Sequence, residues 1–185
     1  MTANAMPSVK LLRQLFDLDK ETGLLFWKAR PANHFRLKRD QVAWNSRNAT
    51  KPITGITGGG YVRVSINKSR YQAHRIIFKL VTGREPIQQL DHANGIRTDN
   101  RWSNLREATH AENLWNHGPH KRNKTGFKGV SASSSWPGHF AADICANGKR
   151  KRLGYFNTAE EAHAAYCKAA KKLHAKFANP GAINQ

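Results

Sequence analysis

A short stretch in the middle of the chain gathers side chains that could hydrolyse a phosphodiester bond. It reads Leu90-Asp91-His92-Ala93-Asn94-Gly95, followed by Asp99-Asn100-Arg101, Ser103-Asn104-Leu105 and Glu112-Asn113. Such hydrolysis needs a divalent ion to stabilise the leaving oxygen and a neutral imidazole to take a proton from water. Asp91 offers a hard oxygen ligand, His92 offers the base, and Asn113 can supply a second oxygen ligand from the next helix.

These side chains depend on the elements that carry them. Adjacent residues of a strand face opposite sides, so Asp91 and His92 can converge only at a bend or a strand end, and Asn94-Gly95 supplies a turn. Thr109 and Glu112 form a capping-box pattern, which predicts a helix from residue 110. Upstream, the alternation over residues 61–66 predicts a strand, residues 70–73 a return strand, and residues 74–82 a helix that ends at Gly83.

The two ends of the chain differ in regularity. Ser8 can cap a helix with apolar positions at helical spacing, residues 24–27 read as a strand, and residues 29–58 are expected to be mostly loop. Residues 127–130, 140–144 and 149–156 predict three strands, with a hairpin at Asn147-Gly148. Thr158 and Glu161 predict a second capped helix, and residues 118–125 read as a linker. The predicted fold class is α+β.

The charge indicates a polyanionic partner. The 185 residues include 31 Lys and Arg against 12 Asp and Glu, a net charge of +19, of which +9 lies in residues 120–185. The charge is spread over strand-like and loop-like stretches, which favours nucleic acid over a membrane surface. No apolar run is long enough to span a membrane, and the N-terminus does not read as a signal peptide. Two distant cysteines without a C-x-x-C argue against a zinc ribbon or a disulfide scaffold and fit a reducing cytoplasm.

The central segment resembles the HNH nucleases, and within them the phage and intron-encoded homing endonucleases. The resemblance rests on four motifs: Tyr71-Gln72-Ala73-His74-Arg75, Asp91-His92-Ala93-Asn94-Gly95, Asp99-Asn100-Arg101-Trp102-Ser103-Asn104-Leu105-Arg106 and Glu112-Asn113. It implies a ββα-metal (His-Me finger) module, with two strands and a helix around one divalent ion. His92 would be the general base, Asp91 and Asn113 the metal ligands, and Asn104 the residue that holds the hairpin loop and orients the base.

The resemblance also implies the cofactor and some DNA contacts. Oxygen ligands suit Mg²⁺, with Mn²⁺ as an alternative, and no structural zinc is expected. His74 either hydrogen-bonds beneath the catalytic hairpin or, with Arg75, contacts the scissile phosphate. Arg101 and Arg106 flank the site, where they either bind phosphate or form a solvated face. A purely structural loop rich in Asp, His and Asn remains the alternative to the whole motif.

Residues 125–178 resemble the plant ethylene-response-factor (APETALA-two) type of DNA-binding domain. The resemblance rests on Thr125-Gly126-Phe127-Lys128-Gly129-Val130, Phe140-Ala141-Ala142-Asp143-Ile144, Leu153-Gly154-Tyr155-Phe156 and the helix that follows. It implies a three-stranded antiparallel sheet, packed on one helix, that enters the major groove. The expected DNA contacts are Lys128, Trp136, His139, Lys149, Arg150 and Arg152. Ser131, Ser133 and Cys145 stand where the plant proteins have Arg, so their target sequence cannot be carried over, and residues 149–152 could also be a solvated charge run.

The predicted organisation is an N-terminal helix and strand region with basic loops (1–57), a nuclease module (58–118), a linker (119–124) and a DNA-binding domain (125–185). The predicted function is site-specific, metal-dependent cleavage of double-stranded DNA by a homing-type enzyme, encoded by a phage or mobile element and acting in the cytoplasm of a bacterial host. One active site predicts nicking by a monomer, and a double-strand break would need a dimer or two events. The alternatives are a transcription-factor-like protein with an inactive module, and a structural or RNA-binding protein. Cleavage with and without EDTA separates these alternatives from a nuclease.

Overall fold

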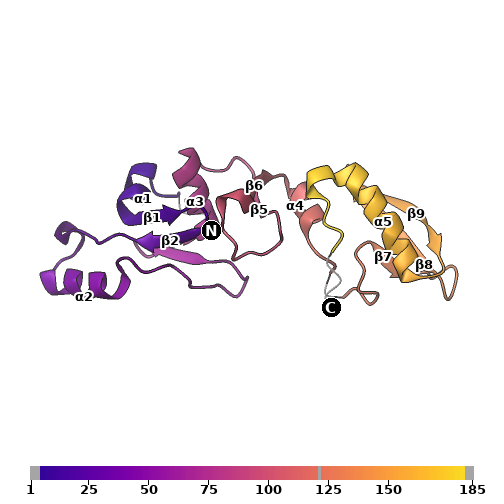
Figure 1. The fold of residues 1–185 in the computed structure, drawn as a ribbon, viewed down its shortest axis with the longest axis horizontal. Coiled ribbons are helices and arrows are strands. Elements are labelled where there is room, and N and C mark those ends of the chain that lie inside the picture. Colours follow the sequence, from indigo (N-terminus) through magenta and orange to yellow (C-terminus); the bar gives the residue numbers. More distant parts are fainter. Residues whose placement is uncertain (1–4, 121, 182–185) are drawn as a thin grey trace. The chain divides into compact units, whose positions relative to one another are not determined.

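The computed structural model describes residues 5–120 and 122–181, and the chain divides into two compact units, Met1–Glu107 and Ala108–Gln185 (Figure 1). The described residues form small sheets and helices of an α+β protein: three two-stranded sheets, β1-β2, β3-β4 and β5-β6, and one three-stranded sheet, β7-β8-β9. The division falls at a different place from the predicted domain boundaries, which remain predictions.

The first unit is built around two helices and their neighbouring hairpins. Its elements are α1 (Val9–Leu15), β1 (Phe16–Asp19), β2 (Leu24–Trp27), η1 (Ala32–His34), α2 (Lys38–Asn48), β3 (Arg63–Ile66), β4 (Ser69–Gln72), α3 (Ala73–Thr82), β5 (Gln89–His92), η2 (Trp102–Asn104) and β6 (Leu105–Ala108). Ser8 caps α1 as predicted, with its Oγ accepting from the Leu11 amide. The buried core joins Leu12 and Leu25 to Ile76 and Ile77. The N-terminal region is therefore part of the body that carries β5 and β6.

The prediction of a loop over residues 29–58 is wrong for its middle, where α2 forms. No side chain of α2 is buried, so its sequence lacks the apolar periodicity that predicts a helix. Polar and aromatic contacts hold it instead. The Arg30 guanidinium lies 4.5 Å from the centre of the Trp27 ring and 4.1 Å from that of Trp44. Gln41 and Asn45 donate side-chain hydrogen bonds to the Arg30 carbonyl.

The second unit contains the predicted three-stranded sheet and its helix. Its elements are α4 (His110–Asn116), β7 (Val130–Ala132), β8 (Phe140–Ala146), β9 (Lys149–Phe156), α5 (Ala159–His174) and η3 (Ala175–Phe177). Both strand pairs are antiparallel, and both predicted capping boxes form. The first strand begins at Val130 rather than at residue 127, because Gly126 and Gly129 have φ of 74° and 75° and interrupt the extended backbone.

The helix α4 packs on the C-terminal part of the second unit. The Trp115 ring stacks on His174 with centroids 4.3 Å apart. Lys128 donates from Nζ to the carbonyl oxygens of Trp115 and Asn179, and Asn179 donates to the Asn116 carbonyl. The helix that carries Asn113 therefore depends on residues far along the chain. No helix among the described residues is long and apolar enough to cross a bilayer.

Candidate active site

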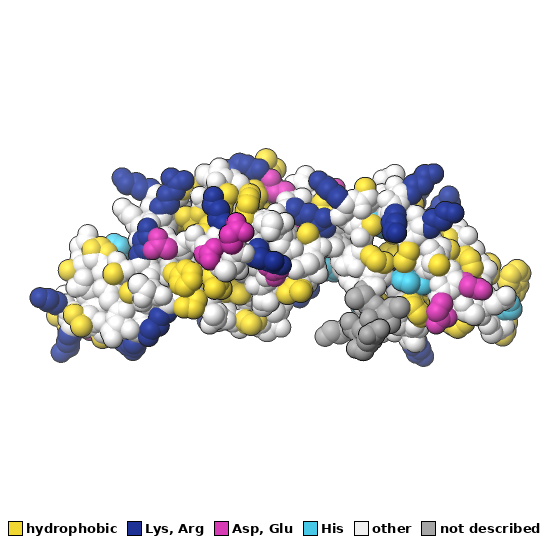
Figure 2. All heavy atoms as spheres, in the orientation of Figure 1, with side chains coloured by type: hydrophobic (Ala, Val, Ile, Leu, Met, Phe, Trp, Pro, Cys, Tyr) yellow, Lys and Arg dark blue, Asp and Glu magenta, His cyan; other side chains and the backbone are white. Residues whose placement is uncertain are grey.

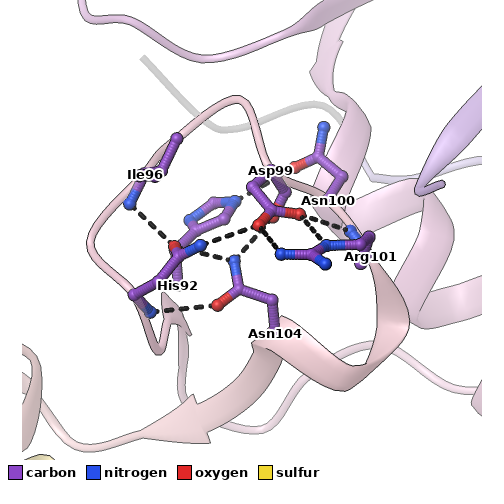
Figure 3. A network of polar contacts seen from close by, with 7 residues as sticks. His92, Ile96, Asp99, Asn100, Arg101 and Asn104 are labelled. Carbon is purple, nitrogen blue, oxygen red and sulfur yellow. Dashed lines mark hydrogen bonds and ion pairs between the residues drawn. The ribbon is translucent and has the colours of Figure 1, made fainter. Parts of the chain in front are cut away.

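Asp91 and His92 are the last residues of β5, the strand end at which adjacent side chains can converge. Each is only 4% exposed. The His92 ring presents Nε2 to the side-chain oxygen of Asn100 at 3.0 Å, and Asn100 is itself 3% exposed (Figure 3). An amide oxygen only accepts hydrogen bonds, so the contact is a hydrogen bond in the tautomer that carries its proton on Nε2 and its lone pair on Nδ1. Nδ1 is then the atom that can take a proton.

Asn104 holds the loop that follows β5. Its side-chain oxygen accepts from the Asn94 amide at 3.0 Å, and its Nδ2 donates to Asn94 Oδ1 and to the Asp99 carbonyl (Figure 3). The Asn104 carbonyl also accepts from the Ala93 amide. These contacts tie Asn104 to the loop, and its role in orienting the base stays a prediction. The hydrogen bond to the base comes from Asn100, a residue that the sequence analysis did not single out.

Asp99 and Arg101 form an ion pair on the same loop. Arg101 Nη2 lies 2.6 Å from one carboxylate oxygen of Asp99, and its Nε lies 2.8 Å from the other. The hydrogen bonds from Arg101 lower the pKa of Asp99 to about 2, so the carboxylate stays charged at neutral pH. The predicted phosphate ligand Arg101 is thus engaged with an acid of its own loop.

Asp91 is paired with Arg106 of the neighbouring strand β6. Arg106 donates from Nε to Asp91 Oδ2 at 2.9 Å, and its Nη2 lies 2.8 Å from the same oxygen as an ion pair. Only 5% of the Asp91 side chain and 20% of the Arg106 side chain are exposed. A buried carboxylate needs such a partner, because an uncompensated charge in the interior is strongly destabilising. Arg106, predicted as a phosphate ligand, therefore neutralises the candidate metal ligand.

His74 is a buried neighbour of the base, at 4% exposed. Its ring centre lies 5.0 Å from that of His92, nearly perpendicular to it, and 5.3 Å from the Tyr61 ring. Burial, with a smaller contribution from His92, lowers the pKa of His74 to about 3, so its ring is neutral at physiological pH. This position favours the structural interpretation of His74 over a direct phosphate contact.

The other cations near this segment also have acidic partners. Arg75 lies 3.8 Å from Glu85, and Lys79 lies 3.0 Å from the same carboxylate. Arg84 binds both oxygens of Glu107. The sequence had marked Arg75 as a possible phosphate contact, but charge counting could not show that acids of the same unit lie beside these cations.

The predicted metal ligands are oxygen donors on two elements. Asp91 ends β5, and Asn113 lies on α4 just after the Thr109–Glu112 capping box. Within residues 5–120 and 122–181, no group of three His, Cys, Asp or Glu side chains could hold a metal ion. Carboxylate and amide oxygens are each suited to a hard cation that keeps water or substrate oxygens among its ligands.

The sheet of the second unit brings together several predicted DNA contacts. Arg150 and Arg152 both bind the Asp143 carboxylate, at 2.6 and 2.7 Å. Trp136 is 57% exposed, and its ring lies 5.0 Å from that of Tyr155, a residue that the sequence analysis did not select. His139 lies 6.0 Å from Trp136 between ring centres, and exposed Lys149 begins β9.

Lys128 does not join this group. Burial lowers the pKa of its ammonium to about 8, and Nζ donates to two backbone carbonyls of the second unit, as described above. The expected contact of Lys128 with DNA thus competes with a structural role that holds α4 and the chain near Asn179 together.

Comparison with known proteins identifies the central segment. Residues 71–114 match the family model of the HNH endonucleases. Over these residues the chain is similar to an HNH endonuclease domain. The matched residues include Asp91, His92, Asn100, Asn104 and Asn113.

One relative extends the similarity beyond this domain. An uncharacterised HNH endonuclease of Acanthamoeba polyphaga mimivirus is 30% identical over 123 residues, which cover 65% of this chain and 63% of the viral protein. The chain therefore matches less than two thirds of that relative's length. No solved structure matches the chain. The resemblance of residues 125–178 to ethylene-response-factor domains remains a prediction.

Proposed function

We propose that the protein is a metal-dependent DNA endonuclease of the homing type in which His92 is the general base. The observation that carries this proposal is the buried hydrogen bond between His92 Nε2 and Asn100 inside the matched HNH segment. It orients the ring and keeps the basic lone pair on Nδ1, which is what a base that activates water requires.

The proposed chemistry is hydrolysis of a phosphodiester. His92 takes a proton from a water molecule through Nδ1, the water oxygen bonds to phosphorus, and the bond to the leaving oxygen breaks. Asn100 keeps the ring in one tautomer and Asn104 keeps the loop in place. Asp91 and Asn113 would hold the divalent ion, for which Mg²⁺ is the best fit and Mn²⁺ the alternative. When bound, the ion would stabilise negative charge on the phosphate and the leaving oxygen.

The proposed substrate is double-stranded DNA. The net charge of +19 supports binding to a polyanion. The exposed Trp136 and the cations of β9 support a role of the second unit in reading the target. A single base per chain implies that one chain nicks one strand, and that a double-strand break takes a dimer or two events.

Nicking of supercoiled plasmid tests the proposal. With Mg²⁺ the wild-type chain should nick, and EDTA should stop the reaction. His92→Ala should lower the single-turnover rate by roughly a hundredfold or more, the usual range for a lost general base. It should leave DNA affinity nearly unchanged, because phosphate contacts carry most of it.

His117→Ala is the matched control. His117 is exposed at the end of α4, so this variant should cleave DNA at the normal rate. A His92→Ala variant with a normal rate would show that another group is the base. Tight binding of duplex DNA without nicking in the presence of either Mg²⁺ or Mn²⁺ would show a non-catalytic DNA-binding protein.

A further inference from the structure

The first unit also has a strongly basic segment outside the matched HNH segment. Residues 28–51, called the basic arm here, follow β2 and contain α2 (Figure 1). The basic arm has seven Lys and Arg residues and a single acid, Asp40, for a net charge of +6. The cations are Lys28, Arg30, Arg36, Lys38, Arg39, Arg47 and Lys51.

The basic arm is tied to β2 at both ends, so its conformation is set before any partner binds. It leaves from Trp27, and on its return the Thr50 amide donates to the Trp27 carbonyl at 2.8 Å. The Ile53 amide then donates to the Leu25 carbonyl, also at 2.8 Å. Between these ends, Arg30 is held between the Trp27 and Trp44 rings. A preorganised segment loses little conformational entropy on binding.

One side of the helix of the basic arm is exposed in the part of the chain that the structure describes. The half-buried residues of α2 are Gln41, Trp44, Asn45 and Asn48, on the side of Arg30. Lys38, Arg39, Val42 and Arg47 are exposed. A short helix gains most of its stability from burying an apolar face, and α2 buries none.

The cations of the basic arm differ from those of the HNH segment in their acidic partners. Arg75, Lys79, Arg84, Arg101 and Arg106 are all within ion-pair distance of an acid. In the basic arm, Lys28 lies 3.1 Å from Asp17 of β1, and Arg39 lies 3.9 Å from Asp40 with both side chains more than half exposed. In the part of the chain that the structure describes, Arg36, Lys38 and Arg47 form no ion pair. These three can bind a phosphate without breaking a pair.

We infer that the basic arm binds the sugar-phosphate backbone of double-stranded DNA and supplies affinity rather than chemistry. This inference rests on the proposed function. Duplex DNA is the occupant that the charge selects, because several exposed cations on one rigid segment match the regular row of phosphates on a duplex. Figure 2 shows dark blue side chains projecting from the end of the first unit that carries α2.

A double variant and its matched control test the inference. Arg36→Gln with Arg47→Gln removes two exposed cations of the basic arm that can bind a phosphate without breaking a pair. Lys10→Gln with Arg13→Gln removes two exposed cations from α1 of the same unit. The affinity of the full chain for a duplex is measured at several salt concentrations, with circular dichroism to check the fold. Each lost phosphate contact lowers the slope of log affinity against log salt by about 0.9, so the arm variant should lose about 1.8.

The expected result is a lower slope and a several-fold weaker affinity for the arm variant alone, with more DNA needed for half-maximal cleavage. Equal slopes in the two double variants would overturn the inference. A loss seen only with RNA, and not with duplex DNA, would also overturn it. A wild-type chain that binds DNA through the basic arm but never cleaves would refute the proposed function and leave this inference standing.

Discussion

Replacing Asn100 with Ala isolates the part of the site that orients the base. The substitution removes the oxygen that lies 3.0 Å from His92 Nε2 and leaves Asp91, His92 and the basic surfaces unchanged. Both partners are almost completely buried, at 3% and 4% exposed, so water cannot readily replace the lost acceptor. The ring could then rotate, which turns the Nδ1 lone pair away from its position, or change tautomer, which places the proton on Nδ1.

The size of the effect follows from the buried contact. A buried donor left without its acceptor costs about 1–3 kcal/mol. At about 1.36 kcal/mol for each tenfold in rate, that corresponds to roughly a 5-fold to 150-fold loss if the whole penalty appears in the transition state. We expect Asn100→Ala to lie within this range and to retain more activity than His92→Ala, which lacks the base altogether.

Asn100→Asp separates orientation from simple stability. The carboxylate still accepts from Nε2, so the rate at alkaline pH should stay near that of the wild type. Its negative charge favours the protonated ring, so the acid limb of the pH–rate profile should move to higher pH. The assay is single-turnover cleavage at saturating DNA over about pH 6 to 9. A thermal melt of each variant checks the fold.

The reasoning would be refuted by an Asn100→Ala variant with a wild-type rate. It would also be refuted if Asn100→Asp left the pH profile in place while Asn100→Ala lost activity, because a merely structural role would give that result. Asn104→Ala serves as the comparison, since Asn104 holds the loop through three side-chain hydrogen bonds and its loss should lower the melting temperature.

Three further predictions test the surroundings of the site. The pKa of His74 is lowered to about 3 in the folded chain, so the unfolded chain binds a proton more readily and the free energy of unfolding falls as pH drops below about 6.5. At pH 5 the loss is about 2 kcal/mol, and urea titrations at pH 5 and 7 should show this loss in the wild type but not in His74→Phe. Gly23 has φ of +71°, and an added Cβ would overlap the backbone of Asn100 and Arg101. Gly23→Ala should therefore destabilise the fold by about 1–3 kcal/mol and slow cleavage, whereas Gly55→Ala, where the added Cβ would lie in open space, should do neither. A chain that ends after residue 120 lacks the partners of Trp115, namely Lys128 and His174, so it should lose the packing of α4 and cleave far more slowly than the full chain; wild-type activity in that truncation would contradict this.

The sequence predicted the elements that have a periodic or capping signal. The apolar spacing and caps of α1, α3, α4 and α5 were sufficient, and so was the Asn147-Gly148 turn, whose residues adopt φ of 51° and 71°. Each of these signals is local, because it depends on residues within one or two turns of each other. The helix α2 has no such signal, since its contacts to Arg30 and Trp27 come from outside the helix.

The candidate site was predictable in its residue types but not in its contacts. The motif marked Asp91, His92 and Asn104, yet the choice of Asn100 over Asn104 as the partner of the ring depends on how the loop closes in space. The same holds for Arg106. Its pairing with Asp91 follows from the neighbouring positions of β5 and β6, which a charge count along the chain does not contain.

The distribution of charge explains why binding and chemistry would use different parts of this chain. Residues 71–107 carry a net charge of only +2, whereas the basic arm carries +6 and residues 120–185 carry +9. A divalent cation is repelled by positive charge, and exposed charges are largely screened beyond a Debye length of about 10 Å in 0.1 M salt. The low net charge of residues 71–107 therefore leaves little repulsion within that segment for an ion held by Asp91. Acids beside Arg75, Arg101 and Arg106 reduce the local positive potential further, which favours a bound cation.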